Sequence, residues 1–513
     1  MKHLTLSTNP GGLHWLADCP RLSGPTASGK LERHLRTVRF DTPDLRLHRR
    51  GVALQVRQEG NRFVQRLAVT PPGNTNDEQV WETEIRGPDP AFERLPETEI
   101  GPILARVARV ELAPVIAWKV RRQTRILQEA CSDGTIEIIE IAFDEGEFEG
   151  GDSPMPIAEV EITLLRGRAA APCRLALELL ESVPLNIEPR SRFERGMQRL
   201  SDVPPRWHKI GRPACTTDVS VDDALAELFR TSLTHFLANE GAALDGRDPE
   251  GVHQVRVALR RMRSAFSSFG RLLTDSQTAD LKAEAKWLAG CLGPARDWDV
   301  FLAGTLTEVE RHHATDPALS AVRQQAERAR QAAYAQARNA LLSQRTTRFV
   351  LTLGRWYEAH EWRTDSPADR FRRPLATFAA DTLDRQYRKV RKGGRGLTHL
   401  PDEARHRLRI GIKKLRYTAE FFALLFDSEA ARTFIAEAVK LQDALGDLND
   451  RATLRIRLDR LQADAPGDVQ LARGIGTVVG DAGADPAAAG EKALRDAWRR
   501  FRRVPAFWPS AQD

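Results

Sequence analysis

Two stretches of this chain repeat one spacing of a histidine and four basic residues, and the copies lie 153 residues apart. Each histidine is followed by Arg or Lys at positions +3, +7, +8 and +10. The first copy is His253, Arg256, Arg260, Arg261 and Arg263, and the second is His406, Arg409, Lys413, Lys414 and Arg416. Leu292-Gly293 and Leu445-Gly446 repeat the same offset further along the chain. The duplication predicts two copies of one structural unit in the C-terminal half.

Both copies have the geometry of a one-sided basic helix. At about 100° per residue, positions 0, +3, +7 and +10 fall within roughly 80° of one another on an α-helix. A basic row on a helix is usually a solvated face, but such faces normally include carboxylates that form i,i+4 pairs. No Asp or Glu interrupts either copy. The two rows therefore predict a pseudo-symmetric receptor for a long polyanion.

The charge of the chain is unevenly distributed. Basic residues total 77 and acidic residues 70, which gives a net charge of +7. Between Arg385 and Arg416, twelve basic residues accompany only two acidic ones. A local excess of this kind indicates an anionic partner more strongly than the net charge does.

The cysteines and the apolar segments exclude several classes of protein. Five scattered cysteines without a CxxC pair indicate neither a disulfide framework nor a cysteine-based zinc site. The first twenty residues contain no sustained apolar stretch, and no run of 18 apolar residues occurs in the chain. We therefore expect a cytoplasmic protein with no membrane segment. The sequence does not indicate its oligomeric state.

The chain divides into two regions of different periodicity. Residues 1–200 contain short, often alternating apolar segments separated by Gly, Pro, Asn or Asp, which are typical of strands. Residues 201–220 are rich in Pro and small polar residues and are predicted to form a linker. From residue 221 onward the pattern is helical, and Asp248-Pro249 is expected to begin the helix of His253. The predicted fold class is α+β multidomain: an N-terminal antiparallel β-barrel followed by an all-α domain of two pseudo-symmetric helical bundles.

The helical half resembles the CHAD family of histidine-containing α-helical domains. Four motifs carry the resemblance in order: HQVRVALRRMRS, LGPARDWDVF, HRLRIGIKKLRYTAEFF and LQDALGDLNDRATL. The resemblance spans 221–508 and implies two bundles around a basic groove that binds inorganic polyphosphate. The implied contacts are the ten residues of the two copies, with Lys389 and Lys392 as secondary ones. Because a polyanion favours the imidazolium form of His253 and His406, we expect tighter binding near pH 6 than near pH 8.

Residues 1–200 resemble the CYTH family of triphosphate-tunnel barrels, at motifs such as Phe40-Asp41-Thr-Pro-Asp44 and Glu188-Pro-Arg-Ser191-Arg192. Active members begin with a Glu-x-Glu-x-Lys strand, whose carboxylates hold a divalent metal. The corresponding residues here are His3, Thr5 and Ser7. The resemblance therefore implies a tunnel-like barrel with a degenerate catalytic motif, and we assign no catalytic residue.

Two pairs of glutamates could still hold a metal in this barrel. Glu82 and Glu84 alternate on one strand, as do Glu159 and Glu161 on another, so each pair shares a strand face. These four are the candidate ligands for Mg²⁺ or Mn²⁺ if the barrel is active. Polyphosphate binding itself would require no cofactor.

The leading hypothesis is a polyphosphate-binding protein, directed to polyphosphate granules, whose CYTH barrel is inactive. One alternative is a metal-dependent inorganic triphosphatase or polyphosphatase. Another is a protein that binds nucleic acid nonspecifically through its basic helices, although their basic faces lack interleaved aromatic residues.

Overall fold

The computed structural model describes residues 2–23, 27–69, 79–95, 112–150, 155–201, 204–211, 213, 216–363, 368–483 and 487–509. It contains two compact units. The first unit comprises residues 1–205 together with 342–359, and the second comprises 206–341 and 360–513. The chain therefore changes units near the predicted linker 201–220, and it returns to the first unit for one short segment.

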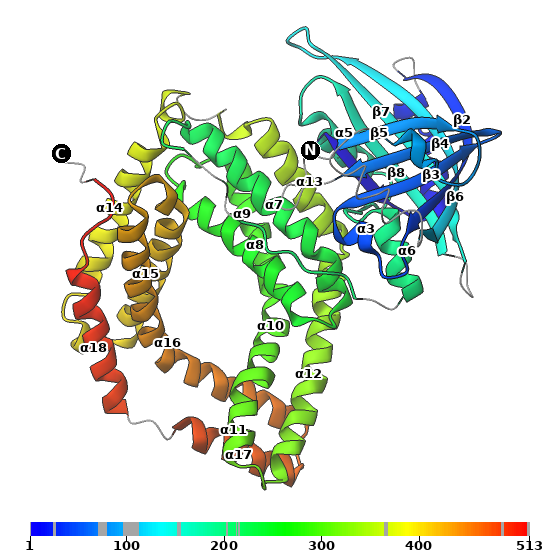
Figure 1. Ribbon diagram of the computed structural model, residues 1–513. Coiled ribbons are helices and arrows are strands. Elements are labelled where there is room, and N and C mark those ends of the chain that lie inside the picture. The colour runs from blue at the N-terminus through cyan, green and yellow to red at the C-terminus, as the bar shows by residue number, and fades with distance from the viewer. Residues whose placement is uncertain are drawn as a thin grey trace. The chain divides into compact units, whose positions relative to one another are not determined.

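The first unit is built on a nine-stranded antiparallel sheet (Figure 1). Its strands are β1 (His3–Ser7), β2 (Ala27–Asp41), β3 (Val52–Glu59), β4 (Arg62–Val69), β5 (Gln79–Ile85), β6 (Ala113–Ala130), β7 (Ile136–Glu149), β8 (Met155–Arg166) and β9 (Asn186–Ile187). The strand order is β5-β4-β3-β2-β6-β7-β8-β1-β9. The predicted antiparallel β structure is confirmed.

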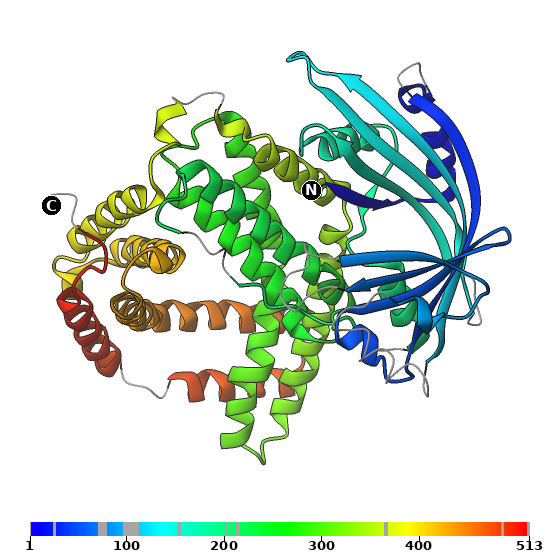
Figure 2. The same cartoon turned by 45° about the horizontal axis from the view of Figure 1, so that its top comes forward.

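The predicted closure into a barrel is not found among the described residues. The strand order begins at β5 and ends at β9, and no described pairing joins these two edges. β9 has only two residues, both of which pair with β1, so it offers little backbone for a second partner. The sheet is strongly curled in Figure 2, but its described hydrogen bonds do not close it.

Helices pack on both faces of this sheet, and those on one face form its main core. The helices of the first unit are α1 (Pro10–Asp18), α2 (Pro20–Ser23), α3 (Arg46–Arg49), α5 (Ala171–Leu180), α6 (Arg192–Ser201) and α13 (Gln344–Glu358). The core joins residues of β1, β7 and β8 to α1, α5 and Leu351 of α13. The backbone N–H of Leu185 donates to Gln344 Oε1 at 2.9 Å, and Arg348 pairs with Glu181. A helix from the middle of the chain thus completes the first unit.

The second unit is helical, as predicted. Its helices are α7 (Val221–Asp245), α8 (Pro249–Ser268), α9 (Ser276–Cys291), α10 (Gly293–Val300), α11 (Thr307–His312), α12 (Ala318–Leu341), α14 (Leu375–Gly393), α15 (Asp402–Phe422), α16 (Ser428–Asp464), α17 (Val469–Gly483) and α18 (Ala487–Arg503). Asp248 caps α8 by accepting from the backbone N–H of Glu250, and Pro249 occupies the first helical position. None of the described helices is both long enough and apolar enough to cross a membrane.

Candidate functional site

A basic cleft lies in the second unit where α8, α9, α10 and α15 meet. It is a cavity of about 590 Å³. Its lining consists of His253, Arg256, Arg260, Arg263, Ser264, Ser267, Lys282, Lys286, Ala289, Arg296, Ile410, Lys413, Lys414 and Tyr417. Eight of these residues carry a permanent positive charge, and none of the residues described as lining the cleft is a carboxylate. This basic cleft is the strongest concentration of one charge in any described cavity of the chain.

The one-sided pattern of α8 produces one wall of the basic cleft. The apolar positions Val255, Leu259 and Met262 are fully buried, which directs the basic positions to the other side of the helix. Helix α15 packs against α8, and the buried hydroxyls of Ser268 and Thr418 hydrogen-bond at 2.8 Å. The two predicted basic helices therefore lie side by side and contribute to one site.

Several cations of the cleft are held in place by their neighbours. Arg256 donates from its Nη1 to the backbone carbonyl of Ala289 at 2.8 Å, which fixes its guanidinium against the end of α9. The guanidinium carbons of Arg260 and Arg416 lie 5.4 and 4.2 Å from the ring centroid of Tyr417, within cation–π range. The site is thus partly preorganised before any ligand arrives.

The cations destabilise one another in the absence of an anion. Burial away from solvent is the main cause that lowers the pKa of Lys413, and repulsion from Arg409 and Arg260 lowers it further. Burial and the charge of Arg296 likewise lower the pKa of His253. The pKa of Arg256 is also lowered, mainly by burial. A bound polyanion would relieve this repulsion, so the cleft is electrostatically prepared for one.

The structure brings together only part of the predicted set. The predicted residues that line the basic cleft are His253, Arg256, Arg260, Arg263, Lys413 and Lys414. The predicted residues outside this lining are Arg261, His406, Arg409, Arg416, Lys389 and Lys392. Arg261 donates instead to the carbonyls of Ile210 and Gly211, and Arg416 to Gln442 and Glu420. The second copy thus contributes two residues to this lining, and the first contributes four.

Three cations of the cleft were not predicted. Lys282 and Lys286 lie four residues apart on α9, and Arg296 lies on α10. The i,i+4 spacing of the lysines was a signal, but Asp280 and Glu284 alternate with them in the sequence, so the helix has the composition of a solvated surface. Only the packing of α9 on α8 reveals that these lysines face the arginines.

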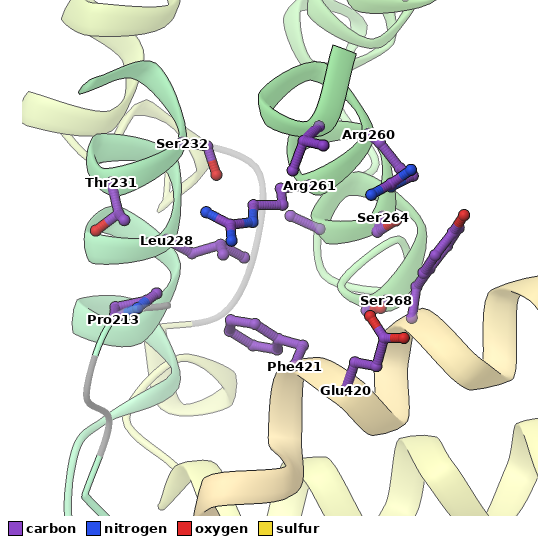
Figure 3. A pocket seen from close by; sticks show the side chains of 13 residues that line it. Pro213, Leu228, Thr231, Ser232, Arg260, Arg261, Ser264, Ser268, Glu420 and Phe421 are labelled. Atoms are coloured by element: carbon purple, nitrogen blue, oxygen red, sulfur yellow. The ribbon is translucent and has the colours of Figure 1, made fainter. Parts of the chain in front are cut away.

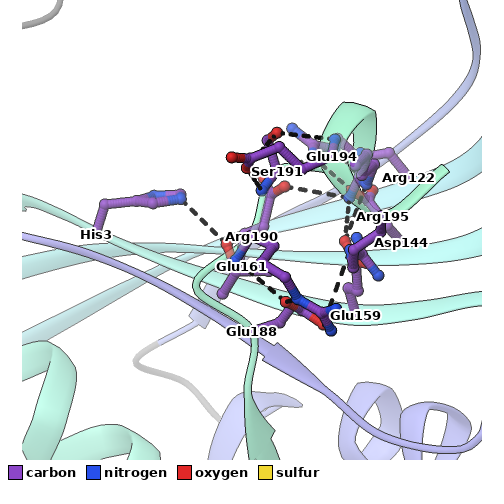
Figure 4. Close-up of polar contacts among 12 residues, drawn as sticks. His3, Arg122, Asp144, Glu159, Glu161, Glu188, Arg190, Ser191, Glu194 and Arg195 are labelled. Atoms are coloured by element: carbon purple, nitrogen blue, oxygen red, sulfur yellow. Dashed lines mark hydrogen bonds and ion pairs between the residues drawn. The ribbon is translucent and has the colours of Figure 1, made fainter. Parts of the chain in front are cut away.

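A second charged group lies in the first unit, on the sheet face that the main core does not use (Figure 4). Asp144 of β7 and Glu159 and Glu161 of β8 bring carboxylate oxygens within 4.8 Å of one another. Asp144 and Glu159 are direct cross-strand partners, and Arg122 of β6 is opposite Asp144. We call Asp144, Glu159, Glu161 and their arginine partners the carboxylate–arginine cluster.

Helix α6 supplies two arginines to this cluster. Phe193 is buried against the sheet beside Phe148, and the arginines before and after it in α6 reach the carboxylates. A Cβ at Gly196 would lie 1.8 Å from the side chain of Ile116, so a larger residue there would force Ile116 or α6 to shift. The packing of α6 on the sheet therefore determines the positions of Arg192 and Arg195.

Each carboxylate of the cluster is paired with arginine. Arg122 donates to Asp144 at 2.7 Å and to Glu161 at 2.6 Å. Arg192 donates to Glu159 at 2.9 Å and also contacts Asp144, while Arg195 pairs with Glu159. Although burial acts in the opposite direction, hydrogen bonds from Arg122 and the charge of Arg192 lower the pKa of Asp144.

This arrangement does not fit a divalent cation. Three carboxylates are the donors that Mg²⁺ or Mn²⁺ prefers, but three guanidinium groups already balance their charge and occupy their oxygens. A metal ion would have to displace buried arginines, which would leave cations without partners at considerable cost. We therefore derive no metal-dependent step at this cluster.

The four glutamates predicted as metal ligands do not form one group. Glu159 and Glu161 belong to the carboxylate–arginine cluster, to which the structure adds Asp144. Glu82 lies 3.5 Å from Arg57 and 3.8 Å from Arg66, and Glu84 pairs with Arg62 at 2.9 Å. The side chains of Glu82 and Glu84 are 43% and 62% exposed, respectively. They form a separate set of surface ion pairs.

Comparison with known proteins identifies the helical region. A family model described as "CHAD domain" matches residues 227–459. The chain contains a CHAD domain. The matched range includes α8, α9, α10 and α15, so the whole basic cleft lies within the CHAD domain.

A solved structure supports the same assignment. The crystal structure of the CHAD domain from the plant Ricinus communis is 28% identical to this chain, with a TM-score of 0.50. The alignment covers 59% of this chain and 99% of the plant domain. The family match does not extend into the N-terminal strands.

Other similar proteins add no functional assignment. Two uncharacterized proteins of Mycobacterium tuberculosis, from strains CDC 1551 and H37Rv, are each 26% identical over 496 residues. These alignments cover 89% of this chain and 89% of each relative. A putative adenylyl cyclase from Hippeastrum with a dominant triphosphatase activity aligns with 38% of this chain at 18% identity. Its TM-score of 0.28 is too low to assign a fold or a function.

Proposed function

We propose that the CHAD domain binds inorganic polyphosphate in the basic cleft. The observation that carries this proposal is a cavity lined by eight permanent cations and, among its described lining residues, no carboxylate. Polyphosphate carries about one negative charge per phosphate and has no other recognition element. Arginine offers forked donors to phosphate oxygens, and lysine offers a mobile positive charge. The cleft supplies both in one place.

The same lining favours polyphosphate over nucleic acid. Single-stranded nucleic acids are held by stacking of their bases on aromatic side chains, in addition to phosphate contacts. Tyr417 is the only Phe, Tyr or Trp in the described lining, and Arg260 and Arg416 lie over its ring. A base would therefore have to displace a cation in order to stack. Attraction of nucleic acid at low salt is still expected, because any polyanion releases counterions on contact.

Binding of long-chain polyphosphate near physiological salt tests the site. In the cleft variant, Lys282, Lys286 and Lys413 are replaced by glutamine. In the control variant, the exposed lysines Lys209, Lys440 and Lys492, which lie outside the lining, are replaced in the same way. Both variants lose the same charge and the same residue type. We expect at least tenfold weaker binding for the cleft variant and a small change for the control; equal losses would show that only net charge matters.

Competition distinguishes polyphosphate from nucleic acid as the ligand. At physiological salt, polyphosphate should displace single-stranded DNA or RNA at a much lower concentration of phosphate units than the reverse displacement requires. Equal displacement in both directions would contradict a polyphosphate-specific cleft. A fluorescent fusion of each lysine variant would test the proposed association with polyphosphate granules. The cleft variant should lose this association, and the control variant should keep it.

A metal-dependent triphosphatase remains the alternative function for the first unit. Its support is the close group of Asp144, Glu159 and Glu161. Phosphate release with Mg²⁺ or Mn²⁺ can be measured in the same binding samples. We expect none, because arginines occupy the carboxylate oxygens. Metal-dependent release that is lost on replacing Glu159 by glutamine would establish the enzyme instead.

A further inference from the structure

A small chamber adjoins the basic cleft on the other side of α8 (Figure 3). It has a volume of about 110 Å³ and lies between α7, α8 and α15. Arg260, Ser264 and Tyr417 line both this side chamber and the basic cleft. The two cavities therefore adjoin at these three side chains. Arg260 is itself exposed, so its long side chain can change conformation without disrupting a core.

The side chamber contains a buried polar group that lacks a partner. Ser232 of α7 is 1% exposed, and its hydroxyl makes no hydrogen bond within the part of the chain that the structure describes. Buried hydroxyls are normally satisfied, and leaving one unpaired costs about 1–3 kcal/mol. Ser264 adds a further hydroxyl group to the lining, whereas the hydroxyls of Thr231 and Ser268 are hydrogen-bonded to Glu227 and Thr418. This composition indicates a ligand with several oxygen atoms.

A fixed arginine contributes positive charge to the chamber. Figure 3 shows Arg261 extending from α8 toward α7. Its Nη1 contacts the carbonyl oxygens of Ile210 and Gly211 at 2.8 and 3.1 Å, and His235 Nδ1 at 3.2 Å. Burial and the charge of Arg261 lower the pKa of His235 to about 4, so this imidazole is neutral and accepts from the guanidinium. Its Nε2 then donates to Gln254 Oε1 at 2.9 Å, which orients the ring.

The one carboxylate in the lining has its own cation. Glu420 accepts from Arg416 at 2.8 Å. That pair offsets its charge, so Arg260 and Arg261 dominate the electrostatics of the chamber. The remaining lining is apolar and includes Leu228, Val257 and Phe421. An apolar wall excludes water and strengthens each charged contact to a ligand.

The volume restricts the ligand to a single small group. An apolar protein cavity of about 150 Å³ accommodates benzene, which has six heavy atoms. A chamber of about 110 Å³ therefore suits a group of about five heavy atoms, such as one phosphate. A second linked phosphate would have to lie on the far side of Arg260, in the basic cleft.

We propose that the side chamber receives the terminal phosphate of a polyphosphate chain whose remaining phosphates lie in the basic cleft. This inference rests on the proposed function of the cleft. A terminal phosphate differs from an internal one because it has an additional oxygen that ionises, with a second pKa near 6 as in phosphate monoesters. Two arginines and the hydroxyls of Ser232 and Ser264 match that extra charge and those extra acceptors. The protein would thereby distinguish chain ends from chain interiors.

The test compares short linear polyphosphate with free ends and the same chains with both terminal phosphates blocked as esters. For the wild-type protein we expect free-ended chains to bind about tenfold tighter, the factor of one charge-assisted hydrogen bond. Ser232→Leu, which fills the chamber, should abolish this preference and leave the affinity for blocked chains unchanged. Ser232→Ala, which removes only the hydroxyl, should reduce the preference in part. Val257→Met fills the chamber from α8 and serves if Ser232→Leu does not fold.

The outcomes separate this inference from the proposed function. If neither kind of chain binds, the polyphosphate function of the cleft is wrong. If both kinds of chain bind equally and filling the chamber has no effect, polyphosphate binding in the cleft is supported and the proposal that the chamber binds chain ends is wrong. Free orthophosphate provides a further arm: at concentrations that occupy the chamber, it should remove the preference for free ends without displacing blocked chains. Displacement of blocked chains by orthophosphate at those concentrations would contradict two separate compartments.

Discussion

Arg256 shows how a single side chain of the basic cleft combines charge with position. Its bond to the carbonyl of Ala289 holds the guanidinium in one orientation, so little side-chain entropy remains to be lost on binding. Lys413 is different, because its ammonium is mobile and its pKa is lowered by loss of solvent and by neighbouring arginines. Arg256 thus offers donors in a fixed orientation. Lys413 offers a positive charge that neighbouring cations repel, and an anionic ligand would offset that repulsion.

Replacing Arg256 by lysine should therefore weaken binding although the charge is retained. Lysine cannot form a forked contact and cannot keep the bond to Ala289 in the same geometry. We expect affinity for polyphosphate to fall about tenfold, or roughly 1.4 kcal/mol. The matched control is Arg263→Lys, at an exposed lining position, for which we expect a loss of about twofold. Isothermal titration calorimetry measures both; equal effects would argue against a special role of the Arg256 orientation.

The pH dependence of binding should come from one histidine. In the free protein the pKa of His253 is below its ordinary value of about 6.5, and a bound polyanion raises it. Protonation then favours the complex, so affinity should increase as pH falls from 8 to 6. His253→Gln should lose this increase, and the same variant reveals how much of the remaining change comes from titration of the ligand. His406 is exposed and lies outside the cleft, so His406→Gln should retain the increase.

At the scale of elements, the basic helix α8 was predictable and its partners were only partly so. Its capping residue, its apolar face and its basic face all follow from the sequence. Of the second basic copy on α15, Lys413 and Lys414 line the cleft, whereas His406 and Arg409 do not, although they follow the same spacing. The lysines of α9 were missed, since a helix with balanced charge gives no sign of which face is covered. Spacing within a helix is local, whereas a shared cavity depends on how helices pack.

The carboxylate–arginine cluster leads to a prediction about α6. Replacing Arg192 by leucine leaves Asp144 and Glu159 with one arginine fewer, which raises the pKa of Asp144 and frees carboxylate oxygens. We expect Mn²⁺ to raise the melting temperature of this variant and to leave that of the wild-type protein unchanged. Arg190→Leu removes a nearby ion pair with Glu188 and serves as the control, which should not respond to Mn²⁺. Stabilisation of the wild-type protein would show that metal can displace the arginines.

Introducing on β1 the Glu-x-Glu-x-Lys pattern of active CYTH proteins should not produce an enzyme by itself. Thr5 and Ser7 are cross-strand partners of Glu161 and Glu159, so glutamates at 3 and 5 and a lysine at 7 would be placed beside the cluster. The arginines would still occupy the carboxylate oxygens of β7 and β8. We expect no phosphate release with Mg²⁺ or Mn²⁺ from the variant His3→Glu, Thr5→Glu, Ser7→Lys. Release would mean that the first strand alone determines activity.

At the scale of the whole molecule, the division into a β region and a helical region followed from periodicity, but the membership of α13 did not. Residues 344–358 have the same helical character as their neighbours in sequence, and no local pattern indicates that they belong to the first unit. Closure of the sheet was likewise beyond the sequence, because strand patterns predict pairing but not how the edges end. Both features depend on contacts between segments far apart in the chain.

A fragment limited to residues 1–205 should therefore be less stable than the first unit in the full chain. It lacks Leu351, which is fully buried in the core beside α5. Loss of a buried leucine typically costs about 2–5 kcal/mol, and here a whole helix is removed. We expect the fragment to melt at a lower temperature and a synthetic peptide of residues 342–359 to restore part of the difference. A peptide with Leu351→Asp is the control, and restoration by it would show that the effect is unspecific.

The placement of α13 also has a consequence for synthesis. During translation the strands of the first unit leave the ribosome early, but their last helix leaves only after α7 to α12 have been made. The surface of α5 that α13 covers therefore stays exposed while the second unit begins to fold from the same nascent chain. Neither half can be exchanged as an independent module by cutting the gene once, because the first unit is encoded in two separate places.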